Sequence, residues 1–296
     1  MTGSDFVRDY ARKGPTAWEA AALELARQGQ LVPWPYVDVA VTDGTNSAIL
    51  KVASDVLSVG TLEDHVRLPL MPIMAQNILN LSGALLPTPL LEYRIWQQAP
   101  LKLHPTGQVP NRGGDLEQYT QHSRVIDAEL AAFGGAQGRL VSGHKKAVLI
   151  ANFYRPIKVL IGGWYRPPPA PDVIDDRRSM SAVDRQPVQP RSNVHGEGYV
   201  DYSHGIRAVG PVAIVNGQAM ATEDLYRHPT LSRLVSDEGP LKIVRYPGAR
   251  VPVAAIRPPS SADPRDAAVD VIPRAPLQPG MIDVGLASIA QQWNRR

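Results

Sequence analysis

Apolar side chains recur at helical spacing in the first half of the chain. The clearest amphipathic helix is expected at residues 16–28, with Thr16 as the N-cap, Glu19 at the capping-box position and Gly29 just beyond the end. Proline in a first turn and glycine or proline after a last turn mark further helices. These are expected at 72–81, 89–98 and 116–133.

Alternating or continuous apolar runs predict strands in the remaining segments. The expected strands are 36–41, 47–52, 56–59, 146–151, 157–164 and 206–215. The turn at residues 43–46 and the segment 152–156 each indicate a hairpin, and Asn216-Gly217 is typical of a third. The continuous apolar runs after Lys146 suit a sheet that is covered on both faces.

Proline and charge interrupt these patterns in two places. Residues 166–193 have no apolar period, so a long loop bordering a site is expected there. A helix at 222–235 is expected to break at Pro229, and the proline-rich chain beyond Tyr246 ends in an apolar segment at 284–293. We expect that segment to dock on the domain or on a partner.

These elements predict an α+β fold with a mixed or mainly antiparallel sheet and helices packed on it. Residues 1–246 are expected to form a single catalytic-like domain, helix-rich over 1–135 and strand-rich over 140–246. Residues 247–296 are expected to form a proline-rich C-terminal extension, through which copies of the chain could associate as a homo-oligomer.

Composition removes several functional classes. The 296 residues include no cysteine, which excludes disulfides, a thiolate nucleophile and cysteine-bound metals. The net charge of +3 is spread among acids rather than gathered on a basic face, so no nucleic-acid partner is expected. No apolar run is long enough for a membrane span, and no signal peptide is visible. The compartment stays open: the cytoplasm, export by a non-classical or lytic route, or a leader that was removed.

Residues 195–207 (HGEGYVDYSHGIR) hold the densest chemistry of the chain. Ser203 is the candidate nucleophile, and it needs a base within hydrogen-bonding distance. Neighbours in a strand point to opposite faces, so His204 is not expected to serve Ser203, whereas Asp201 lies on its face. His195 or His144 would then be the base. The alternative is a buried hydrogen-bonded corner without catalysis.

Four further residues are expected to bind substrate. Lys145 stands beside His144 at the mouth of an apolar strand, and Arg207 could hold an anionic group. Tyr202 lies within the dense stretch, and Trp164 follows two glycines and could stack on a sugar ring. No cofactor is expected.

The sequence also contains residues for three alternative kinds of site. Histidines 144, 195 and 204 with Asp201 could hold zinc, but no metal-binding spacing is present, and no metal is expected. Glu197 with Asp201, or Asp237 with Glu238, could form the acid pair of a glycosidase. The Ser142-x-x-Lys145 spacing matches a penicillin-recognising motif, but a strand follows where that motif requires a helix.

Four motifs resemble those of a family of largely uncharacterised bacterial and phage-borne proteins. They are Gly143-His-Lys-Lys, Gly163-Trp, Tyr199-Val-Asp-Tyr-Ser-His-Gly-Ile-Arg and Leu234-Val-Ser-Asp-Glu-Gly-Pro. The resemblance covers residues 35–245. It implies a shared site around His144, His195, Ser203, His204 and Arg207, and for some members an association with peptidoglycan-binding modules.

A second, weaker resemblance is to the Ser-His-Gly-Cys-x-Arg motif of L,D-transpeptidases. Here Ile206 replaces the catalytic cysteine, so that mechanism is not carried over. We expect a hydrolase of a polymer, with a cell-wall peptide or glycan as the leading substrate class. The alternative is a non-enzymatic structural or binding protein of a phage or secretion assembly, with a buried His/Tyr/Ser network.

Overall fold

The structure is a computed structural model that describes residues 1–108, 115–167 and 187–254. Helices form much of the N-terminal half, and strands dominate after residue 140, as the sequence predicts. The helices are α1 (Gly3–Tyr10), α2 (Pro15–Arg27), α3 (Pro72–Asn80), α4 (Pro89–Gln98), α5 (Leu116–Ala131), α6 (Thr222–Arg227) and the 3₁₀ helix η2 (Leu231–Leu234). None of the helices in these ranges is both long and apolar enough to cross a membrane.

One four-stranded sheet is antiparallel throughout and combines two strands from the first quarter of the chain with two strands that follow residue 208. Its order is β1 (Tyr36–Thr42), β2 (Ser47–Ala53), β11 (Val209–Val215) and β12 (Gln218–Ala221). The expected hairpins at 43–46 and at Asn216-Gly217 are both present, and β2 pairs with β11 to join them into one sheet. The Gln98 side chain covers part of the β1 edge, because it donates to Ala40 O and accepts from Ala40 N.

A second sheet carries the residues of interest. Its order is β10 (His204–Gly205), β7 (Lys146–Val148), β8 (Ile161–Tyr165) and β9 (Pro187–Ser192). Strand β10 runs parallel to β7, while the other pairs are antiparallel, so the protein is α+β with a mixed sheet. Two short pairs complete the topology: β3 (Ser58–Gly60) with β4 (His65–Arg67), and β5 (Leu101–Lys102) with β6 (Val141–Ser142).

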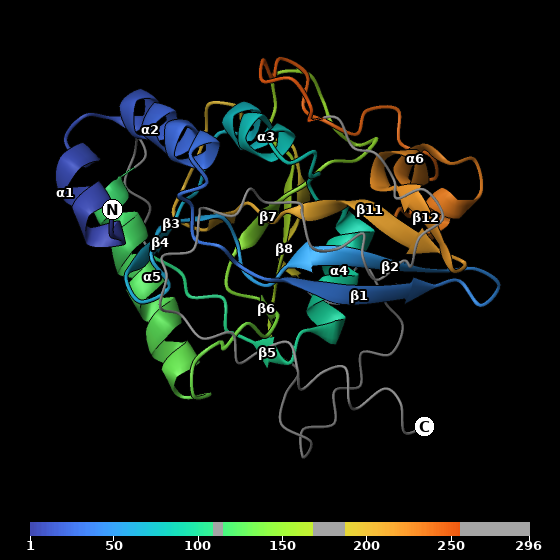
Figure 1. The fold of residues 1–296 in the computed structure, drawn as a ribbon, viewed down its shortest axis with the longest axis horizontal. Coiled ribbons are helices and arrows are strands. Elements are labelled where there is room, and N and C mark those ends of the chain that lie inside the picture. The colour runs from blue at the N-terminus through green and yellow to red at the C-terminus, as the bar shows by residue number, and fades with distance from the viewer. Residues whose placement is uncertain (109–114, 168–186, 255–296) are drawn as a thin grey trace, which may run out of the picture.

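Figure 1 shows α1, α2 and α5 grouped at one end of the molecule, with the β1–β2 hairpin extending toward the other end and α6 beside β12. A continuous set of buried apolar side chains, from Phe6 in α1 to Tyr246, connects these layers. The last described residues stay close to α3, where Arg250 N and Val251 N donate to Asn77 Oδ1 and Ala254 N donates to Asn80 O.

Two predictions about local structure were wrong. Helix α2 begins at Pro15 after Gly14, whose φ of 79° and missing side chain leave the helix without a side-chain cap. Glu19 is therefore no capping-box residue; it is buried and accepts a hydrogen bond from Met71 N. The expected loop at 166–193 contains β9, which pairs with β8. Residues 168–186 of that loop and the apolar segment 284–293 lie outside the described residues.

Candidate active site

The centre of the dense stretch is a turn around Asp201. Ser203 N and Ser203 Oγ both donate to Asp201 Oδ1, the former at 2.8 Å, and His204 N donates to Asp201 O at 3.1 Å. The expected strand alternation is therefore wrong at this point: Asp201 and Ser203 meet because the backbone turns between them. The serine hydroxyl serves to orient one carboxylate oxygen.

The other oxygen of Asp201 faces three polar side chains. Tyr199 donates its hydroxyl to Oδ2 at 3.1 Å, Lys146 Nζ lies 3.8 Å from it, and His204 Nε2 lies 3.9 Å from it. Burial favours the neutral acid, but His204, the Ser203 hydrogen bonds and Lys146 outweigh it and lower the pKa of Asp201 to about 2. The carboxylate is thus ionised at neutral pH. We call Lys146, Tyr199, Asp201, Ser203 and His204 the Asp201 cluster.

Strand pairing explains why this cluster forms. In the parallel β10–β7 pair, His204 is the register partner of Lys146, so their side chains leave the sheet on the same face. The turn that precedes β10 places Asp201 over that face. Because β7 and β10 are distant in sequence, this juxtaposition depends on the sheet topology.

His204 is the most unusual member of the cluster. Its side chain is fully buried, and neither ring nitrogen has a hydrogen-bond partner within the described residues. Burial lowers the pKa of His204 to about 4, although Asp201 opposes the shift. A neutral, unpaired imidazole beside an ionised carboxylate is costly to retain for packing alone, which makes a functional role worth testing.

His195 does not reach Ser203. Its partly exposed ring stacks on Tyr199, with ring centroids 4.0 Å apart, and Tyr199 in turn contacts His204 edge-on. Within the described residues no histidine nitrogen is hydrogen-bonded to Ser203 Oγ. The expected histidine-activated serine is therefore not formed in this structure.

The remaining residues of the expected substrate set are mostly buried. Trp164 is 7% exposed and packs under Lys146, whose Nζ lies 5.0 Å from the ring centroid. The Tyr202 hydroxyl bonds to Gln108, accepting from its N and donating to its O. Trp164 does not present the open stacking surface expected from the sequence, and the Tyr202 ring is likewise buried.

His144 belongs to a separate interior cluster. Its Nε2 lies 2.9 Å from Asp55 Oδ1, while Arg67 donates from Nε and Nη2 to Asp55 Oδ2 at 3.0 and 2.8 Å. Burial opposes ionisation of Asp55, yet Arg67 and His144 hold the pKa of Asp55 well below its usual range. An ionised carboxylate only accepts, so His144 Nε2 carries the proton. This bond fixes the histidine as a structural partner of Asp55.

Lys145 and Arg207 also point into the interior. Lys145 Nζ donates to Tyr202 O, and Arg207 donates to Ala53 O and Val141 O, each at 2.7 Å. Both line a cavity of about 10 Å³ together with Glu92, which has room for roughly one water molecule. Burial lowers the pKa of Lys145 to about 7 and raises that of Glu92 to about 7. These side chains tie backbone segments together, so the structure gives Arg207 a different role from the expected anion binding.

Sequence reasoning missed the charged residues that complete this interior. Asp55, Arg67 and Glu92 are all 5% exposed or less. The available signal was a single charge inside an otherwise apolar run, as at Arg67 in His65-Val-Arg-Leu-Pro-Leu. Such a charge needs a buried partner, although the sequence does not name it.

The structure also shows where the residues of the alternative sites lie. Asp237 and Glu238 both form ion pairs with Arg191, at 2.6 and 3.1 Å, rather than facing each other across a cleft. Ser142 lies in β6, so it shares no helical turn with Lys145. Across the described ranges, no group of three or more His, Asp or Glu side chains is arranged to hold a metal ion.

The comparisons with known proteins return nothing: no protein-family profile, curated protein or solved structure matches this chain. The resemblances noted from the motifs therefore stay expectations.

Proposed function

We propose that this protein is a hydrolase that cleaves a polymer at the Asp201 cluster, with the peptide part of a cell wall as its substrate class. The observation that carries the proposal is the pairing of His204, whose buried ring nitrogens lack partners in the described structure, with the oriented carboxylate of Asp201. This arrangement supports general-base catalysis, in which a carboxylate stabilises the imidazolium that forms.

The proposed step needs only water and an amide bond. His204 takes one proton from a water molecule at Nδ1, the ring nitrogen that does not face Asp201, as the water oxygen attacks the carbonyl carbon. The carbonyl electron pair moves to the oxygen, where the Lys146 ammonium can stabilise the negative charge. Collapse of this intermediate breaks the C–N bond, and the His204 imidazolium returns the proton to the leaving amine. Ser203 holds Asp201 in place and forms no covalent intermediate.

The exposure of each side chain determines whether it can contact the polymer. The His204 ring is closed to a water-sized probe, so the proposed step requires a local opening beside Tyr199 that admits the attacking water. The polymer would lie over the partly exposed side chains of Lys146, Tyr199 and His195. Within the described residues Asp201 is the carboxylate of this cluster, which favours peptide over glycan cleavage because glycosidases use two.

The test is to incubate the full-length protein with purified peptidoglycan and to measure new amino groups and new reducing ends separately. Amino groups are expected, and their release should fall by at least about 100-fold in His204→Gln. His195→Ala should weaken substrate binding, while His104→Ala, which removes an exposed histidine, should match the wild type. Full turnover in both His204→Gln and His195→Ala would overturn the proposal.

A non-enzymatic role is the second candidate, and a specific observation favours it. Ser203 and His144 are both enclosed and bonded to aspartates, as in a network that serves stability. If this role is correct, peptidoglycan stays intact and light scattering shows a large assembly of the full-length chain. A monomer that releases amino groups would exclude it.

A further inference from the structure

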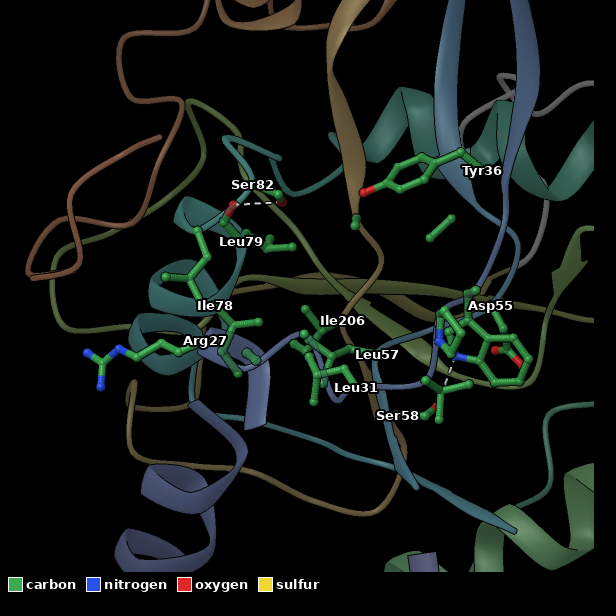
Figure 2. Close-up of a pocket in the computed structure, with 18 residues that line it drawn as sticks. Arg27, Leu31, Tyr36, Asp55, Leu57, Ser58, Ile78, Leu79, Ser82 and Ile206 are labelled. Atoms are coloured by element: carbon green, nitrogen blue, oxygen red, sulfur yellow. Dashed lines mark hydrogen bonds between the residues drawn. The ribbon is translucent and has the colours of Figure 1, made fainter. Parts of the chain in front are cut away.

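A cavity away from the Asp201 cluster shares none of that cluster's residues. It has a volume of about 240 Å³. Its walls come from the end of α2, the segment leading into β1, strand β3, the end of α3, and Ile206 with Ala208 (Figure 2). The cavity reaches the surface, because Arg27 and Pro33 at its rim are exposed.

The walls are mainly apolar. Leu31, Leu57, Leu79 and Ile206 contribute aliphatic surface, and Trp34 contributes a ring. The Trp34 indole N–H is already satisfied by Ser58 Oγ at 3.2 Å, and Ser58 Oγ donates to Val56 O. A guest would therefore meet apolar surface over most of its area.

Charge is kept out of the cavity. Asp55 contributes to the wall, but both of its carboxylate oxygens are engaged by His144 and Arg67. The Arg27 side chain extends away from the cavity in Figure 2 and forms an ion pair with Glu24 at 3.4 Å. The electrostatics favour a neutral guest.

The Tyr36 hydroxyl is a polar group of the cavity wall that remains free to bind a guest. It makes no hydrogen bond within the described residues, and in Figure 2 it points away from β1, toward the side on which Leu79 lies. Burial alone raises the pKa of Tyr36 to about 12, so the group stays a neutral donor. Tyr36 is half-buried and its hydroxyl is not sealed from solvent, so water or a ligand oxygen can reach it and accept its hydrogen bond.

The volume limits the size of the guest. An apolar cavity of roughly 150 Å³ is enough to bind benzene, so this one holds a ring with a short substituent. Concave, mostly apolar pockets with a few polar groups are the usual sites of small-molecule binding in proteins.

We infer that this cavity is a binding site for a neutral, compact apolar molecule that carries one carbonyl or ether oxygen, with the Tyr36 hydroxyl donating to that oxygen. Nothing in the inference depends on hydrolysis at the Asp201 cluster. Acetophenone is a suitable probe, and ethylbenzene is its counterpart without the oxygen.

The experiment follows the indole N–H signal of Trp34 in the full-length protein by NMR, assigned from its loss in Trp34→Phe. Both probes are expected to shift the signal, and acetophenone is expected to bind more tightly. Tyr36→Phe should weaken acetophenone binding by about three- to tenfold and leave ethylbenzene unchanged. Because the hydroxyl has no partner to lose, this variant should fold normally. Tyr10→Phe, outside the cavity, is the matched control.

A substitution that fills part of the cavity tests whether the probes bind there. Ala208→Leu should reduce binding of both probes, because it occupies part of the volume. If neither probe shifts the Trp34 signal, or if Tyr36→Phe weakens both probes equally, the inference is overturned.

Discussion

Lys145 and Lys146 are adjacent in sequence, but their amino groups lie in different surroundings. Lys145 Nζ donates to Tyr202 O in the interior, whereas Lys146 Nζ lies 3.8 Å from Asp201 beside Tyr199. The motif residues thus form two groups. One group surrounds Asp201 and includes the partly exposed Lys146 and Tyr199, and the other links backbone segments in the interior.

Ser203→Ala distinguishes a positioning serine from a nucleophile. The variant removes one hydrogen bond to Asp201, so the free energy of unfolding should fall by about 1–2 kcal/mol. Turnover of peptidoglycan should fall by about tenfold and persist, whereas loss of a covalent nucleophile lowers turnover by roughly 10⁶. Ser4→Ala is the control, since Ser4 also donates to an aspartate, Asp64, but on the surface. Complete inactivation by Ser203→Ala would restore the nucleophile hypothesis.

The lowered pKa of His204 should be detectable in the pH dependence of the free energy of unfolding. Its pKa is about 4 in the folded protein and about 6.5 when unfolded, so the unfolded chain binds the proton first as the pH falls. Stability is expected to drop by about 3 kcal/mol between pH 6.5 and 4 because of this residue. Urea unfolding at several pH values should show a flatter profile for His204→Gln, while His104→Gln keeps the wild-type slope. Parallel profiles for all three proteins would contradict the assignment.

Glu19 should affect the pH dependence of stability in the opposite direction. Burial raises the pKa of this carboxyl to about 7, so its contribution to stability is present below about pH 4.5 and is lost as the pH rises to 7. Glu19→Gln keeps the acceptor for Met71 N and should raise the free energy of unfolding by about 3 kcal/mol at pH 8, with little change at pH 4. Glu24→Gln, on the exposed side of the same helix, is the control. An equal gain at both pH values would argue against this explanation.

Breaking the interior ion pair should be costly. Arg67→Met leaves Asp55 ionised and buried with His144 as its remaining side-chain partner, so we expect a loss of about 3–5 kcal/mol in chemical denaturation. Arg8→Met removes an arginine that pairs with Asp5 at a similar distance on the surface, and no measurable change is expected. A loss below about 1 kcal/mol for Arg67→Met would show that Asp55 finds another partner or becomes protonated.

Gly143 is expected to be irreplaceable because of space as well as conformation. Gly143 and Gly44 have similar φ angles of 94° and 92°, but a Cβ on Gly143 would lie 2.3 Å from Leu103 O, whereas one on Gly44 would meet nothing within 4 Å. Gly44→Ala should therefore cost about 1 kcal/mol and Gly143→Ala at least about 3 kcal/mol. Thermal unfolding measures both, and equal costs would mean that the backbone near Leu103 yields.

Local patterns predicted the elements that local chemistry determines. Alternation located β1 and β2, Asn216-Gly217 located the β11–β12 turn, and Pro229 separates α6 from η2 as expected. The capping box was assigned to the wrong helix. It occurs in α1, where Thr2 and Asp5 cap each other, and that short helix was not predicted.

The candidate site was only partly predictable, for a physical reason. The residue types of the Asp201 cluster are visible at 195–207, but their grouping depends on the parallel pairing of β10 with β7, which no local period encodes. The same holds for His144, because its partner Asp55 lies 89 residues earlier in the chain, between β2 and β3. Sequence patterns thus indicate which residues carry chemistry more readily than which of them meet.

The pairing of β2 with β11 also affects biosynthesis. Ile49 is opposite Ile214, so the hairpin made early in translation keeps one edge of apolar strand unpaired until most of the chain has left the ribosome. Long-range pairing of this kind slows folding. We expect the free edge of β2 to be accessible to chaperones or to other nascent chains until residues 209–215 are made, and ribosome pausing between residues 53 and 209 would lengthen that exposure.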